Sequence, residues 1–224
     1  MKLKNTEFKE IKNDSNFRVV EIFRTVEGEG RWVGLPITFI RLEGCNLRCE
    51  WCDTPYSYNG FSYKEYPLNE LFKIVEGFGL KRVCITGGEP FYSRNLPLLI
   101  KKFLDNSYKV FVETNGTLWL PEIKNIFNDN LYITCSPKPP LYYVNPELIP
   151  FISELKFVVD KNLTIENIIN PALDKLLKND VIVLQPESNL PERVEKALNL
   201  QDELLKKGIE SRIIPQCHKV LGLP

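Results

Sequence analysis

The chain has 224 residues, of which 43% are hydrophobic and 26% charged, so its composition excludes a collagen-like or wholly disordered protein. The 29 Lys and Arg residues balance 29 Asp and Glu residues, which excludes the basic excess of a duplex nucleic-acid binder. No stretch approaches the ~18 apolar residues of a membrane span, and the first residues lack a signal peptide's apolar core.

These properties predict a cytoplasmic protein with neither a nucleic-acid nor a membrane partner. We expect a single domain over residues 1–224, in which residues 1–16 form an N-terminal extension.

Short β-rich runs alternate with amphipathic helical runs along the chain. Strands are predicted over residues 17–23, 36–42, 81–86, 109–114, 131–136, 154–160, 181–185 and 211–216. Helices are predicted over residues 68–78, 96–105, 121–127, 146–152, 165–178 and 191–208. This alternation is typical of α/β proteins with a parallel sheet. Because a complete barrel takes ~250 residues, we expect an incomplete, open parallel βα barrel of about six core strands, with residues 17–23 at an edge.

Polar motifs that contain Gly, Pro or both follow five of the predicted strands. They are TGGEP (86–90), ETNGT (113–117), SPK (136–138), QPES (185–188) and PQCHK (215–219). In parallel α/β folds the carboxyl ends of the strands meet at one mouth, where ligands bind. One such motif alone could be an ordinary turn, but five together predict a shared ligand site.

Three of the six cysteines lie within eight residues, as Cys45, Cys49 and Cys52. Cytoplasmic thiols stay reduced, so the spacing C-x3-C-x2-C indicates a metal centre instead of a disulfide framework. Structural zinc and electron-transfer iron–sulfur clusters usually take four protein ligands. Three local thiolates would leave one iron of a 4Fe–4S cluster open to an exogenous ligand, as reductive cleavage of S-adenosylmethionine requires.

Two other metal sites are alternatives. One is a zinc site that His218 or a distant cysteine completes, and the other is a ferredoxin-like carrier that Cys84 or Cys135 completes. Cys84 and Cys135 lie inside predicted strands, where free cysteine commonly packs as a small hydrophobic residue, and we interpret them in that way.

The cysteine spacing, followed by a strand that ends in Gly87-Gly88-Glu89-Pro90, resembles the radical S-adenosylmethionine superfamily. The two glycines would let the backbone approach a ligand closely. Glu89 would offer its carboxylate to the ammonium group of the methionyl moiety.

From about residue 20 onward the chain also resembles the 7-carboxy-7-deazaguanine synthase family. The resemblance rests on VEGEG (26–30), Arg41, CDT (52–54), SPK (136–138), QP (185–186) and PQCHK (215–219). Two positions depart from the family pattern, with Glu27 where Gln is frequent and Cys217 where Thr is common. The first departure changes the charge and the hydrogen-bonding polarity at a substrate position.

The resemblance implies a carbon–nitrogen lyase that converts 6-carboxy-5,6,7,8-tetrahydropterin to 7-carboxy-7-deazaguanine by ring contraction with loss of ammonia, in the biosynthesis of queuosine or archaeosine. It also implies a 4Fe–4S cluster, S-adenosylmethionine and Mg²⁺ as cofactors, a homodimer, and an electron donor such as flavodoxin or ferredoxin. The alternatives are an activase of a glycyl-radical enzyme, which acts on a protein partner, and a non-enzymatic iron–sulfur or zinc binding module.

The resemblance assigns site residues in three groups and no catalytic side chain. Cys45, Cys49 and Cys52 would hold the cluster, and Thr54 would bind Mg²⁺. The S-adenosylmethionine site would comprise Trp51, Cys52, Asp53, Gly88, Glu89, Ser136, Pro137, Lys138, Gln185, Pro186, Glu187 and Ser188. The pterin site would comprise Val26, Glu27, Gly28, Arg41, Thr86, His218 and Pro224.

Overall fold

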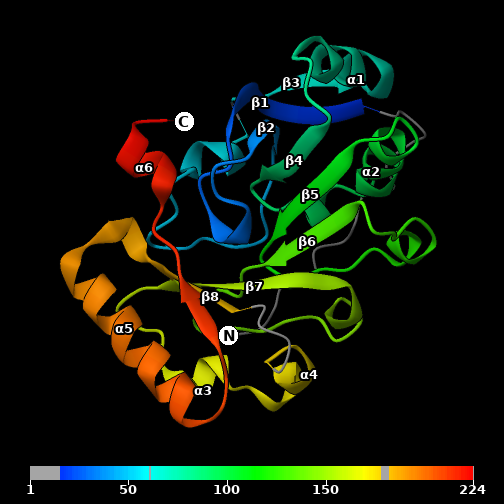
Figure 1. Ribbon diagram of the computed structural model, residues 1–224. Helices are drawn as coiled ribbons and strands as arrows, with labels where there is room; N and C mark the ends of the chain where they lie inside the picture. Colours follow the sequence, from blue (N-terminus) through cyan, green and yellow to red (C-terminus); the bar gives the residue numbers. More distant parts are fainter. Residues whose placement is uncertain (1–15, 61, 178–181, 224) are drawn as a thin grey trace.

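The computed structural model describes residues 16–60, 62–177 and 182–223 (Figure 1). In these residues one nine-stranded sheet runs in the order β3-β1-β2-β4-β5-β6-β7-β8-β9. Its strands are β1 (Asn16–Val26), β2 (Pro36–Leu42), β3 (Lys64–Pro67), β4 (Arg82–Gly87), β5 (Lys109–Thr114), β6 (Leu131–Cys135), β7 (Ile152–Val159), β8 (Ile182–Pro186) and β9 (Ser211–Ile213). The helices are α1 (Leu68–Gly77), α2 (Leu96–Leu104), α3 (Ile165–Ile168), α4 (Asp174–Leu177), α5 (Pro191–Lys206) and α6 (Cys217–Leu221).

Neighbouring strands from β2 to β9 run parallel, whereas β1 pairs antiparallel with β2 and with β3. In the described residues β3 and β9 form the two edges of the sheet. The predicted open parallel βα barrel is therefore confirmed, with seven parallel strands. The expectation that β1 lies at an edge was wrong, because residues 64–67 form a short charged strand that pairs outside it.

Alternation along the strands gives the sheet two different faces. Val83 and Ile85 of β4 pack in the main core beneath the helices, whereas Cys84 between them packs on the opposite face. Val110 and Val112 of β5 behave in the same way. Side chains two residues apart in a strand share a face of the sheet. Glu113 and Thr86 therefore point to the same face as Phe111 and Cys84, which we call the inner face.

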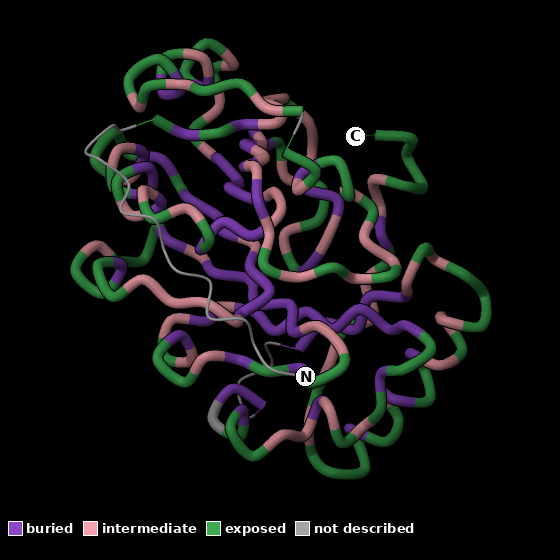
Figure 2. The backbone as a smooth tube through the Cα atoms, turned by 180° about the vertical axis from the view of Figure 1, so that it is seen from behind, coloured by how far each residue is buried: buried purple, intermediate pink, exposed green. Residues whose placement is uncertain are grey.

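The helices cover the outer face of the sheet, and the buried backbone is concentrated in the strands (Figures 1 and 2). Phe72 of α1, Phe103 of α2 and Tyr108 before β5 form an aromatic cluster, with ring centroids 5.1–5.9 Å apart. On the inner face Ile37, Cys84 and Phe111 pack with Trp32, Phe39 and Tyr132. We call these six residues the inner aromatic cluster.

Three predicted helices were wrong in extent, and proline accounts for most of the difference. Residues 121–127 and 146–152 form only 3₁₀ turns, at Pro121–Asn125 and Ile149–Phe151. Residues 165–178 break at Asn170-Pro171 into α3 and α4, since the residue before proline avoids helical geometry. No helix in the described ranges is both long and apolar enough to cross a bilayer.

Candidate active site

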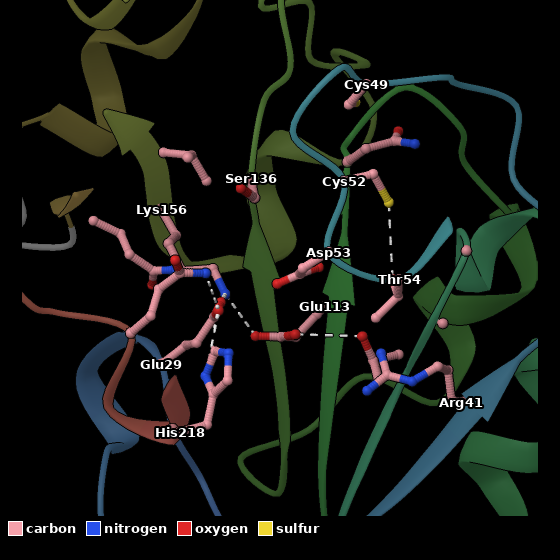
Figure 3. A pocket seen from close by; sticks show the side chains of 18 of the residues that line it. Glu29, Arg41, Cys49, Cys52, Asp53, Thr54, Glu113, Ser136, Lys156 and His218 are labelled. Atoms are coloured by element: carbon pink, nitrogen blue, oxygen red, sulfur yellow. Dashed lines mark hydrogen bonds and ion pairs between the residues drawn. The ribbon is translucent and has the colours of Figure 1, made fainter. Parts of the chain in front are cut away.

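The carboxyl ends of the parallel strands open into one cavity of about 410 Å³ (Figure 3). All five polar motifs contribute to its wall, together with the loop after β1 and residues 43–54 after β2, here called the cysteine loop. The predicted convergence of the motifs on one mouth is confirmed. The inner aromatic cluster lies beneath the cavity, because Phe111 and Cys84 share the inner face with Glu113 and Thr86, two residues further along their strands.

Most of the predicted site residues line this cavity. They are Val26, Glu27, Gly28, Arg41, Cys49, Trp51, Cys52, Asp53, Thr54, Thr86, Gly88, Ser136, Lys138, Gln185, Glu187 and His218. The residues that do not line it are Cys45, Glu89, Pro137, Pro186 and Ser188. Pro224 lies outside the described residues.

Hydrogen bonds hold the cysteine loop between two strand ends. On one side, the Asn46 side chain donates to Thr117 Oγ1 at 2.8 Å and accepts from Asn115 Nδ2 at 3.0 Å. On the other side, Trp51 Nε1 donates to Asp160 Oδ2 at 2.9 Å. Because Asn115 and Thr117 follow β5 and Asp160 follows β7, the loop is fixed over the mouth from both directions.

The three clustered cysteines differ in exposure from the two buried ones, Cys84 and Cys135. Cys45, Cys49 and Cys52 are free and half-buried, and the latter two line the cavity. Burial raises the pKa of the Cys45 thiol to about 11, so iron would have to displace its proton. Cys84 and Cys135 are fully buried among apolar side chains, which confirms their interpretation as core residues.

Gly87 and Gly88 are required by the protein's own backbone. Gly87 has φ of 140°, and a Cβ there would lie 2.2 Å from Leu42 O. A Cβ on Gly88 would lie 2.1 Å from the oxygen of Gly44, which begins the cysteine loop together with Glu43. The two glycines were predicted to let the backbone approach a ligand closely. In the structure they let the end of β4 approach the end of β2 and the start of the cysteine loop.

Glu89 is buried, and the surrounding protein uses both of its carboxylate oxygens. Oε1 accepts from Phe91 N at 3.0 Å and from Thr114 Oγ1 at 2.7 Å, and Oε2 accepts from Asn115 N at 2.6 Å. Burial raises the pKa of Glu89, although these hydrogen bonds oppose the shift. The carboxylate therefore joins the ends of β4 and β5 in this structure and does not face the cavity.

Lys156 lies at the charged centre of the cavity (Figure 3). Its Nζ forms ion pairs with Glu113, at 2.7 Å, and with Glu29. Burial alone would lower the pKa of Lys156, but the two carboxylates outweigh it and raise the pKa well above its ordinary value. Burial likewise opposes ionisation of Glu29, yet Lys156 and Gln216 hold its pKa below the ordinary value. Glu29 and Lys156 are therefore charged.

Glu27 is a third acid in the same wall, and no cation in the described ranges forms an ion pair with it. It is buried and lines the cavity, and its Oε1 accepts one hydrogen bond, from Glu29 N at 3.2 Å. Burial raises its pKa well above the ordinary value, and the negative charge of Glu113 adds to this shift while Lys156 opposes it.

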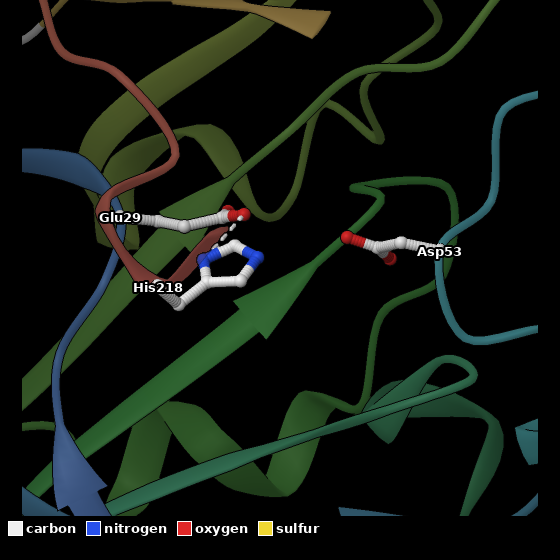
Figure 4. A group of neighbouring side chains, drawn as sticks. All are labelled: Glu29, Asp53 and His218. Carbon is white, nitrogen blue, oxygen red and sulfur yellow. Dashed lines mark ion pairs between the residues drawn. The ribbon is translucent and has the colours of Figure 1, made fainter. Parts of the chain in front are cut away.

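Glu29, Asp53 and His218 approach one another from opposite sides of the cavity (Figure 4). Each offers a ligand atom within 4.8 Å of the others, and His218 Nδ1 lies 3.8 Å from Glu29 Oε1. We assign no metal to this group, because Lys156 already neutralises Glu29. A Cβ on Gly28 would lie 2.7 Å from His218 Cβ, so glycine is needed for the histidine to fit there.

Arg41 and Thr54 lie on the other side of the cavity from Glu29 (Figure 3). Arg41 Nε donates to Glu21 Oε1 at 2.5 Å, which orients the guanidinium group. The Thr54 side chain does not cap the 3₁₀ turn that follows it, and its Oγ1 lies 3.9 Å from Cys52 Sγ. Both side chains are thus placed to meet a ligand.

Several important residues were not predicted, namely Glu29, Asn46, Lys156, Asp160 and Gln216. Asn46 and Asp160 look like ordinary turn residues in the sequence. One available signal was Glu154-x-Lys156, because two charged residues two apart in an otherwise apolar strand must share the inner face.

Comparison with known proteins identifies the family. The Radical SAM superfamily model matches residues 39–136. A 7-carboxy-7-deazaguanine synthase from Aquifex aeolicus is 45% identical over 213 residues, which cover 95% of this chain and 96% of that protein. The chain belongs to the 7-carboxy-7-deazaguanine synthase family.

Other members of the synthase family agree with this assignment. The 7-carboxy-7-deazaguanine synthase of Thermoplasma acidophilum is 35% identical over 211 residues, covering 91% of this chain and 96% of that protein. The crystal structure of QueE from Escherichia coli superposes with a TM-score of 0.69 at 25% identity, covering 88% of this chain and 93% of that chain. The synthase family therefore accounts for both the sequence and the open barrel.

Proposed function

We propose that this cavity performs the family's reaction, the conversion of 6-carboxy-5,6,7,8-tetrahydropterin to 7-carboxy-7-deazaguanine with loss of ammonia. The observation that supports it most directly is that one cavity combines a cysteine loop with a separate wall of charged and polar groups. Membership of a lyase family and of the radical S-adenosylmethionine superfamily implies a 4Fe–4S cluster and S-adenosylmethionine as cofactors.

Cys45, Cys49 and Cys52 would hold the cluster, which supplies reductive cleavage of S-adenosylmethionine when bound. Lys138 stands next to the cysteine loop, and its ammonium group lies 5.0 Å from the indole ring of Trp51 in that loop. Burial lowers the pKa of Lys138, and its Nζ lies 2.7 Å from Ser136 Oγ. We assign Lys138 to the carboxylate of the methionyl moiety, since a buried cation favours an anionic partner.

The other predicted residues of this cofactor site divide into two kinds. Asp53, Gly88, Gln185 and Glu187 line the cavity and are proposed to contact S-adenosylmethionine. Pro137, Pro186 and Ser188 stand in the same segments and are proposed to shape the wall. We assign Glu89 a positioning role, because its oxygens already accept three protein hydrogen bonds.

The pterin is proposed to lie between Arg41 and the wall that contains Glu29, Lys156 and His218. Glu21 occupies Nε of Arg41, which leaves the terminal nitrogens of the guanidinium group to bind the substrate carboxylate. Thr86 Oγ1 donates to Glu113 Oε2 at 3.3 Å, so it orients that acid toward the ring. Val26, Glu27 and Gly28 would contact the substrate from the loop after β1.

Thr54 is the proposed protein ligand of Mg²⁺. Its hydroxyl group does not cap the 3₁₀ turn that follows, and its Oγ1 lies beside Cys52 Sγ. The hydroxyl group therefore borders the space between the cysteine loop and Arg41. Mg²⁺ prefers oxygen ligands and commonly takes few of them from the protein and the rest from substrate and water.

A homodimer, a cytoplasmic location and an electron donor such as flavodoxin or ferredoxin complete the proposal. A one-electron donor is needed because reductive cleavage consumes an electron. Family resemblance supports these three points, and light scattering of the purified chain tests the first of them.

Anaerobic turnover tests the function. The reconstituted full-length chain is incubated with the tetrahydropterin carboxylate, dithionite and S-adenosylmethionine, and 7-carboxy-7-deazaguanine is measured by mass spectrometry. We expect product, about four irons per chain, and loss of both in Cys45→Ala, Cys49→Ala and Cys52→Ala. Cys84→Ala is the matched control and should keep its iron. Deoxyadenosine release without pterin product would favour the glycyl-radical activase, and bound zinc without iron would favour the binding module.

A further inference from the structure

One wall of the cavity brings together three acids, and its lysine, Lys156, forms ion pairs with two of them. Glu27, Glu29 and Glu113 approach one another there, and Lys156 lies among them. Lys156 forms ion pairs with Glu29 and Glu113, and none with Glu27. Among the described residues, Glu27 is therefore the acid of this group without a counter-ion.

In the described part of the chain, the other cations that line the cavity contact other partners than Glu27. Arg41 on β2 is engaged by Glu21, and Lys138 after β6 lies beside Trp51 and Ser136. His218 on α6 lies 3.8 Å from Glu29, and Lys219 Nζ, next along α6, donates to Ser188 Oγ at 3.3 Å.

The surroundings of Glu27 are buried and include the apolar inner aromatic cluster, which also disfavours a negative charge on its carboxyl group. The Glu27 side chain is buried above the inner aromatic cluster, where the Cys84 thiol lies close enough to sense the charge of both Glu27 and Glu113. A buried carboxylate without a cation takes up a proton instead of remaining ionised. Burial and Glu113 raise the pKa of Glu27 in the same sense.

We propose that Glu27 binds the substrate as a neutral carboxylic acid, donating its proton to an acceptor atom of the pterin ring. Glu29 N donates to Oε1 of Glu27, and Oε2 has no hydrogen bond within the described residues, so the protonated oxygen is available to a ligand in the cavity. The proposal rests on the proposed function for the identity of the ring. It makes Glu27 a specificity-determining residue, because an ionised carboxylate in its place would only accept hydrogen bonds.

The pH dependence follows from this protonation state. As pH rises through the raised pKa, Glu27 loses the proton that it donates, so kcat/KM for the pterin should fall on the alkaline side. In the unfolded chain Glu27 ionises near its ordinary value of 4.5, while the folded chain keeps the proton. The free energy of unfolding therefore decreases as pH rises above 4.5, until the folded pKa is reached.

Three variants of the full-length reconstituted protein test the proposal. Glu27→Leu removes the donor and should raise the KM for the pterin about tenfold. Glu27→Gln restores a neutral donor, so it should recover most of that loss and abolish the alkaline decline in kcat/KM. Glu27→Gln should also raise Tm relative to the wild type above pH 4.5 and leave it equal below. Glu203→Gln, on the exposed face of α5, is the matched control and should change none of these quantities.

Infrared difference spectroscopy gives a direct readout that needs no turnover. The wild-type spectrum minus the Glu27→Gln spectrum at neutral pH should contain the C=O stretch of one protonated carboxylic acid. Absence of that band, or a Glu27→Gln variant as impaired as Glu27→Leu, would overturn the proposal. If the wild type formed no 7-carboxy-7-deazaguanine, the proposed function would fail, while the infrared band would still decide whether Glu27 carries a proton.

Discussion

At the scale of single residues, Lys156 places a positive charge between two acids of the cavity wall, Glu29 and Glu113. It forms ion pairs with two carboxylates while buried itself, and it gives each of them a fixed direction. Removing one partner of a buried ion pair typically costs about 3–5 kcal/mol, because an unpaired charge is left behind. Lys156 therefore acts by positioning Glu29 and Glu113.

Thr54 carries a prediction at the same scale. Thr54→Ala removes the proposed oxygen ligand and should raise the Mg²⁺ concentration for half-maximal turnover about tenfold, the effect of one lost polar contact. The iron content should stay unchanged, because Oγ1 is not a ligand of the cluster. Turnover measured against Mg²⁺ concentration checks this.

Thr54→Ser is the matched control for this prediction. It keeps the hydroxyl group and should respond to Mg²⁺ as the wild type does. An identical Mg²⁺ response in all three proteins would remove Thr54 from the metal site.

At the scale of elements, the cysteine loop depends on the turn after β5. Asn46 exchanges hydrogen bonds with Asn115 and Thr117, which ties the loop to the ETNGT motif. Glu89 strengthens the same junction from β4, because it accepts from Thr114 and from the backbone of Asn115. These two elements thus position the cysteines without being ligands.

The corresponding prediction concerns the stability of the cluster. Asn46→Ala removes two hydrogen bonds of about 1 kcal/mol each. It should increase the rate of cluster loss in air and raise the KM for S-adenosylmethionine, each by about tenfold. Asn106→Ala, which removes one amide hydrogen bond at the exposed end of α2, is the control. Equal rates of cluster loss in the two variants would show that the junction does not support the loop.

Sequence patterns predicted the six parallel strands β2, β4, β5, β6, β7 and β8 because each has a run of buried apolar residues. The short strand β3 escaped prediction, since Lys64 and Glu65 give its four residues no apolar pattern. The helices around Pro150 and Pro171 were overestimated, because their apolar spacing suggested helix where the prolines do not allow it.

The site residues were predictable where a short sequence motif contains the reactive groups. They were not predictable where a role depends on contacts between residues distant in the sequence. Cys45, Cys49 and Cys52 are adjacent in sequence, and Arg41 stands out in an apolar strand. Gln216 belongs to the predicted motif PQCHK, but its role was not predictable, because that role depends on a contact with Glu29, which is 187 residues away. The two residues come together only when the chain folds.

At the scale of the whole molecule, Gln216 connects three distant parts of the chain. Its side chain donates to Glu29 Oε1 at 3.1 Å and accepts from Ser188 N at 2.8 Å. Its backbone exchanges hydrogen bonds with Asn189 at 2.8 and 3.0 Å. Ser188 and Asn189 both have positive φ, so Gln216 holds a strained turn against the loop after β1.

Gln216→Ala should therefore open the pterin side of the cavity. We expect the KM for the pterin to rise about tenfold, from the loss of hydrogen bonds to buried groups, with the iron content unchanged. Gln201→Ala, which loses a single contact to Ser211 O, is the matched control. An unchanged KM in Gln216→Ala would mean that the strained turn keeps its shape without the glutamine.

The seam between the loop after β1 and residues 216–218 also has a consequence for the order of folding. Cys217 N donates to Gly28 O at 2.8 Å, and His218 packs against Gly28, so two segments that are far apart in the sequence close one wall of the cavity. Bringing such distant segments together costs loop-closure entropy, which the sheet assembled between them has to offset. The hydrogen bonds that hold the cysteine loop join residues closer in the sequence, namely Asn46 with Thr117 and Trp51 with Asp160. We therefore expect the cysteine loop to dock first during folding and the wall of Gly28 and His218 to close after it.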